Sequence, residues 1–166
     1  PSELHVTLFD YRWDKESKEP RPHPLANDPQ KLQVFIDNIR SLLRDFSPTT
    51  IYFKELALFE NGAIIACGYP QDFPSGSTES SVDLMRQSYL SAYPEGSAPN
   101  IAHITIGRFL TSISGIEHGQ VLDKIAEFNK APLGIITFEE IKILYETRYW
   151  LSQVKALATI NLIGGS

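Results

Sequence analysis

Two short motifs in this chain combine a histidine with a threonine two residues later. Residues 5–8 read His-Val-Thr-Leu, and residues 103–106 read His-Ile-Thr-Ile. Both motifs alternate polar and apolar residues, a pattern typical of a β-strand, in which residues two apart share a face. The histidine and threonine of each motif should therefore point together, while the apolar residues point into the core. The four candidate site residues are His5, Thr7, His103 and Thr105.

These four side chains suit the chemistry of a small anionic ligand. An imidazole titrates near neutral pH, so one histidine can accept a proton while the other donates one. Threonine hydroxyls can donate hydrogen bonds to non-bridging phosphate oxygens, where negative charge builds up in the transition state. If the two strands lie side by side at the centre of a two-lobed sheet, the four groups converge on one cleft. No cofactor is then required.

The paired His-x-Thr motifs resemble those of the 2H phosphoesterase superfamily, which includes the RNA 2′,3′-cyclic phosphodiesterases, among them proteins named 2′-5′ RNA ligases. Residues 102–108 (Ala-His-Ile-Thr-Ile-Gly-Arg) are similar to the second motif of that family, including its trailing basic residue. The expected order of elements also matches, from residue 4 to about residue 162. The resemblance implies a two-lobed α+β fold without a metal, with His5 and His103 as the acid–base pair and Thr7 and Thr105 holding phosphate.

On this basis the sequence predicts a metal-independent phosphodiesterase that hydrolyses 2′,3′-cyclic phosphate or a related bond at a nucleotide or RNA end. One histidine would activate water and the other would protonate the leaving ribose oxygen; which histidine does which stays open. The alternative from another class is a non-catalytic nucleotide-binding module that uses the same cleft. A metal hydrolase is a third interpretation.

Four further side chains are candidates for binding substrate. Arg108 follows the second motif on the opposite strand parity, and a bulge permitted by Gly107 would turn it toward the substrate. A surface salt bridge is the alternative role of Arg108. Tyr11 and Trp13 follow the first motif, where an aromatic ring would either stack on a base or pack at a strand end. Tyr149 would line the cleft or pack in the core.

The remaining histidines and the single cysteine predict little chemistry of their own. His23, between prolines, and His118, at a helix start, are expected to be solvated. A metal site that combined one of them with His5 and His103 would lack local spacing such as His-x-His or HExxH. Cys67 lies in an apolar run and is expected to be an inert, buried thiol. One cysteine excludes an internal disulfide and favours a reducing compartment such as the cytoplasm, and we expect no signal peptide.

Composition limits the partners. The chain has 166 residues, of which 42% are hydrophobic and 21% charged, as in a single globular domain. It contains no run of eighteen apolar residues, so no membrane span is expected. The formal net charge of −5 argues against a grip on long DNA or RNA, and residues 48–100 hold two basic against six acidic residues. We therefore expect a monomer that binds a mononucleotide or a single RNA end.

The chain is expected to form one α+β domain over residues 1–166. Helical periodicity, caps and turn signals predict each element. The expected helices cover residues 29–46, 79–93 and 118–130, and the expected strands cover residues 4–9, 50–59, 63–67, 101–109, 135–145 and 149–160. Each half has the order strand, loop, helix, strand, strand. This repeat predicts two lobes, 1–70 with the helix near 79–93 and 101–162, built from antiparallel sheets with helices on their outer faces and a central cleft that carries both motifs.

Overall fold

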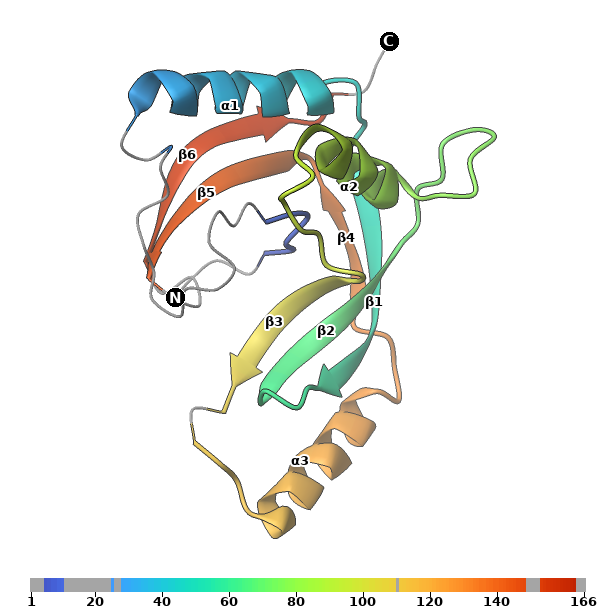
Figure 1. Ribbon diagram of the computed structural model, residues 1–166. Helices are drawn as coiled ribbons and strands as arrows, with labels where there is room; N and C mark the ends of the chain where they lie inside the picture. The colour runs from blue at the N-terminus through green and yellow to red at the C-terminus, as the bar shows by residue number, and fades with distance from the viewer. Residues whose placement is uncertain (1–4, 11–24, 26–27, 110, 149–152, 164–166) are drawn as a thin grey trace.

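The computed structural model describes residues 5–10, 25, 28–109, 111–148 and 153–163 of the chain (Figure 1). Within these ranges the chain forms three α-helices and six strands, which confirms the α+β class. In sequence order the elements are α1 (Pro29–Leu43), β1 (Thr49–Leu58), β2 (Ala63–Pro70), α2 (Ser81–Ala92), β3 (Ala102–Arg108), α3 (Gly115–Phe128), β4 (Gly134–Phe138), β5 (Glu140–Arg148) and β6 (Gln153–Asn161).

The strands form two antiparallel sheets, one with the order β3-β2-β1-β4 and one made of β5 and β6. The larger sheet thus combines β1 and β2 from the first half of the chain with β3 and β4 from the second half. The lobes predicted for residues 1–70 and 101–162 therefore do not correspond to separate sheets. Figure 1 shows both sheets curled, with α1 along β6, α2 near the start of β1 and α3 at the opposite end of the larger sheet.

Local signals account for most of the element boundaries. Asp28 and Ser80 cap α1 and α2, because each side chain accepts a hydrogen bond from the backbone N–H three residues later. The hairpin predicted from Asn-Gly joins β1 to β2, and Gly62 has a φ of 77°. α3 begins at Gly115, three residues before its predicted start, because Ser114 and Glu117 form a capping box that apolar periodicity alone does not reveal.

Two strand predictions were wrong. The strand predicted over residues 135–145 is divided at Glu139, so that β4 pairs with β1 whereas β5 pairs with β6. Residues 5–9 do not form a strand, and Asp10 makes only an isolated antiparallel bridge with Ser97. Val6 and Leu8 nevertheless pack against the core as predicted. The alternation in the first motif therefore does not correspond to a paired strand, and Phe9, next to Leu8, packs against the same core.

The main core lies between one face of the larger sheet, the helices α1 and α2, and the end of β6. Its buried side chains are Ile39 and Leu43 from α1; Val82, Met85 and Tyr89 from α2; Ile51, Phe53, Ala66, Ala102 and Ile104 from the sheet; and Ile160 and Leu162. Phe9 extends this core by stacking on Tyr89, with ring centroids 4.0 Å apart. None of the helices in the described part of the chain is long and apolar enough to cross a membrane.

A glycine on the core face of β2 provides a test of this packing. A Cβ at Gly68 would lie 2.6 Å from Cγ2 of Ile51 and 2.9 Å from Cε1 of Phe53. We expect Gly68→Ala to lower the free energy of unfolding by about 1–3 kcal/mol, because overpacked cores must shift. Urea denaturation measures this change.

The matched control is Gly119→Ala in α3, where a Cβ would meet nothing within 4 Å. Alanine is favoured over glycine inside a helix by about 1 kcal/mol, so this variant should be more stable than the wild type. A Gly68→Ala variant as stable as the wild type would contradict the packing described for this face.

Candidate phosphate site on strand β3

The second motif lies on β3, where Ile104 faces the core as predicted, whereas Ile106 is 54% exposed and is not part of the core. Ala102 and Ile104 are buried in the core, whereas His103 is half-buried and Thr105 is exposed. This confirms that His103 and Thr105 share the face turned away from the core. β3 is at the edge of the larger sheet, where it pairs with β2.

A β-bulge brings Arg108 to the same face. Ile65 pairs with Thr105 and Ile64 pairs with Gly107, so Ile106 is the additional residue on β3. The bulge reverses the strand parity, and Arg108 pairs with Ala63 on the face that carries Thr105. Its guanidinium donates a hydrogen bond from Nη1 to the carbonyl oxygen of Asn61, over 3.1 Å. The bulge predicted at Gly107 therefore exists one residue earlier.

The sheet register adds three polar groups beside His103 that sequence analysis did not place there. Cys67 pairs directly with His103, and Glu55 pairs with Cys67 on the next strand. Paired residues of neighbouring strands share a face, so these three side chains form a row. The hydroxyl of Tyr69 donates a hydrogen bond to Oε1 of Glu55, over 2.8 Å. The Asn-Gly turn fixes the pairing of Glu55 with Cys67 and could have revealed that part of the row.

The local environment keeps the thiol of Cys67 and the neighbouring hydroxyl of Tyr69 in their neutral forms. Burial raises the pKa of the Cys67 thiol, and the nearby Glu55 carboxylate raises it further. The hydrogen bond to Glu55 raises the pKa of the Tyr69 hydroxyl. Cys67 is half-buried and not fully buried, but a protonated thiol is a poor nucleophile, in agreement with its predicted inertness.

The segment of the first motif is attached to the residues that precede β3. The backbone N–H groups of Asp10 and Ser97 each donate to the carbonyl of the other, over 2.7 and 2.8 Å. The Arg86 side chain, on α2, donates from Nε to the carbonyl oxygen of Leu8 (3.2 Å) and from Nη2 to that of Ile101 (3.1 Å). Figure 1 shows residues 5–10 in blue, among β3, α2 and the β5–β6 hairpin.

The sequence suggested that the two motifs form adjacent strands of one sheet, and this prediction was wrong. His5 and Thr7 are half-buried on a segment without strand pairing, whereas His103 lies on β3. Tyr11, Trp13, His23 and Tyr149 fall outside the described residues. His118 is exposed on α3, as predicted. Within the described ranges, no group of three or more His, Cys, Asp or Glu side chains is placed to hold a metal ion.

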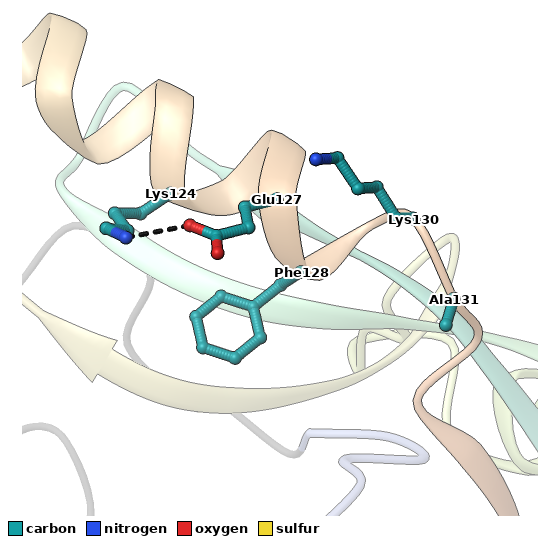
Figure 2. A pocket seen from close by; sticks show the side chains of 5 residues that line it. All are labelled: Lys124, Glu127, Phe128, Lys130 and Ala131. Atoms are coloured by element: carbon teal, nitrogen blue, oxygen red, sulfur yellow. Dashed lines mark hydrogen bonds and ion pairs between the residues drawn. The ribbon is translucent and has the colours of Figure 1, made fainter.

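A hollow of about 350 Å³ lies at the end of α3, away from these motif residues in the sequence (Figure 2). It is lined by Lys124, Glu127, Phe128, Lys130 and Ala131. Nζ of Lys124 forms an ion pair with Oε2 of Glu127 at 2.7 Å, and Phe128 is 62% exposed. None of the predicted site residues contributes to this hollow, so it is not the site that the motifs predict.

Comparison with known proteins adds no relative: no protein-family model matches the chain, and no curated protein matches it. The resemblance to the 2H phosphoesterases therefore rests on the residues of the two motifs, since the first strand of the expected element order is not formed. The geometry of β3 described above is independent of that resemblance. It places an imidazole, a hydroxyl and a guanidinium on one face of one strand, which is a suitable arrangement for binding one phosphate group.

The single cysteine makes the electrostatics of this face measurable. We expect the rate of Cys67 alkylation by iodoacetamide to rise with pH around a midpoint above that of a free thiol such as N-acetylcysteine, because burial and Glu55 both raise the thiol pKa. Glu55→Gln should lower this midpoint only in part, since burial is the larger cause. A midpoint at or below that of N-acetylcysteine would show that the environment of Cys67 is not the one described.

Proposed function

We propose that this protein is a metal-independent phosphodiesterase that hydrolyses 2′,3′-cyclic phosphate on a nucleotide or an RNA end. The observation that carries the proposal is the shared face of His103, Thr105 and Arg108 on β3, which depends on the bulge at Ile106. An imidazole that accepts or donates a proton, beside two hydrogen-bond donors, supplies part of what the hydrolysis of a cyclic phosphodiester requires, and the proposed reaction takes its second acid–base group from His5.

In the proposed reaction, the oxygen of a water molecule attacks phosphorus while one histidine takes the proton of that water. The bond between phosphorus and one ribose oxygen breaks, and the second histidine donates a proton to the leaving oxygen. The product is a ribose phosphomonoester, and each histidine ends in the protonation state in which the other began. Thr7, Thr105 and Arg108 donate hydrogen bonds to the non-bridging oxygens.

The first motif supports the proposal through the way its segment is held. Val6, Leu8 and Phe9 pack against the core. Leu8, which ends the first motif, and Ile101, two residues before His103, share the guanidinium of Arg86. One side chain of α2 thus binds the last residue of the first motif and a residue just before the second motif.

Hydrolysis of a panel of 2′,3′-cyclic nucleotides tests the proposal. We expect turnover in the presence of EDTA, and we expect His5→Ala and His103→Ala each to lower kcat by about 10²–10⁴-fold, the usual contribution of an acid or a base. His118→Ala is the matched control, because His118 is exposed on α3, and it should retain the wild-type rate. Equal turnover by the wild type and both motif variants would refute the proposed mechanism.

A melting experiment with AMP on the same samples separates hydrolysis from binding alone. If AMP raises Tm in the wild type and less so in His103→Ala, while no cyclic nucleotide is converted, the face of β3 binds nucleotide without catalysis. Loss of turnover on chelation would instead indicate a metal hydrolase. Either result would replace the proposed reaction.

A further inference from the structure

The guanidinium of Arg86 is almost fully buried. It is also one of few basic groups in its part of the chain. Its exposed fraction is 6%, and residues 48–100 contain only two basic residues, Lys54 and Arg86. A buried charge is costly unless other groups replace its hydration. Burial lowers the pKa of Arg86, and the carboxylate of Asp83, 3.6 Å from Nη1, acts in the opposite direction. An arginine nevertheless remains charged at neutral pH.

The hydration of this charge is replaced mainly by two backbone carbonyls from distant parts of the chain. Nε binds the carbonyl oxygen of Leu8 at 3.2 Å, and Nη2 binds that of Ile101 at 3.1 Å. A guanidinium is planar and presents its N–H groups in a fixed fork, so the two carbonyls are held in a defined relation to each other. A single apolar side chain at this position could fill the space but could not join the two segments.

One of these carbonyls also faces the second histidine. Nδ1 of His103 lies 3.5 Å from the carbonyl oxygen of Ile101, a contact longer than the usual N–H···O hydrogen bond of about 2.7–3.2 Å. The group that accepts from one ring nitrogen decides the tautomer and orientation of an imidazole, and hence the role of the other nitrogen. Arg86 therefore fixes the position of an oxygen atom against which the His103 ring is oriented.

We propose that Arg86 is a positioning residue, which fixes the segments of the two His-x-Thr motifs relative to each other and orients His103 through the carbonyl of Ile101. This inference rests on the proposed function for its catalytic consequence. Its structural content is independent of catalysis, because the bond between Asp10 and Ser97 lies beside the same two segments and reports whether they stay together.

The first test is amide hydrogen exchange by NMR, with Arg86→Met and with Asp83→Asn as the matched control. Without the guanidinium, the Asp10 and Ser97 amides should exchange at least 10-fold faster relative to the amides of the β1–β2 ladder. Asp83→Asn loses the ion pair but keeps both carbonyl bonds, and should exchange like the wild type. Exchange is compared with the β1–β2 ladder because a change in global stability accelerates all core amides together. Unchanged relative exchange of the Asp10 and Ser97 amides in Arg86→Met would overturn the inference.

The second test is catalytic. A small misplacement of a reacting group can cost about 10²-fold in rate, so kcat of Arg86→Met should fall by that order. Arg86→Lys keeps the charge but lacks the planar fork, and should lie between Arg86→Met and the wild type; it also replaces Arg86→Met in both tests if that variant does not fold. In a His103→Ala background the loss caused by Arg86→Met should be much smaller, since both changes act on the same imidazole.

The two proposals fail in different ways. If the wild type converts no cyclic nucleotide, the proposed function fails, and the exchange of Asp10 and Ser97 still decides whether Arg86 joins the segments. If the wild type is active and Arg86→Met retains its kcat, the positioning role is refuted while the proposed function stands. Additive losses in Arg86→Met and His103→Ala would likewise refute an action through His103.

Discussion

The burial of one face of the larger sheet beneath α1 and α2 decides where the polar side chains of β3 point. Ala102 and Ile104 are held in the core with Phe53 and Met85, and a strand that buries alternate residues must present the others on the opposite side. His103 and Thr105 are therefore directed away from the core by the packing of their neighbours. The face of β3 on which these two side chains lie does not depend on an interaction of their own.

The constraint reaches Arg108 only because the strand is irregular. In an uninterrupted strand Arg108 would share the parity of Ile104 and face the core, which is unfavourable for a charged group. The additional residue at Ile106 resolves this conflict, since it returns Arg108 to the side of Thr105 while the pairing with β2 continues. The bulge therefore keeps the charged side chain of Arg108 out of the core and places it on the polar face. An edge strand tolerates such an irregularity because only one neighbour has to follow it.

The predictable part of this structure is the part that local chemistry encodes. Caps at Asp28 and Ser80 and the Asn-Gly turn predict where elements begin and reverse, and alternation predicts the polar face of β3. The same alternation failed for residues 5–9, which pack Val6, Leu8 and Phe9 against the core without pairing in a sheet. The neighbours of His103 could not be predicted either, because the register of β2 on β3 joins residues that no turn connects directly.

The charges of residues 48–100 bear on the size of the proposed ligand. Six of the twenty acidic residues lie in residues 48–100, and one of the two basic residues there, Arg86, directs its charge to backbone carbonyls and to Asp83. It is therefore not free to neutralise a phosphate at the surface. On the described face of β3, Arg108 carries a positive charge and donates a hydrogen bond to the carbonyl oxygen of Asn61. Long nucleic acids are held by neutralising many phosphates. The guanidinium and the imidazole on this face are consistent with the proposed ligand, which carries one phosphate group.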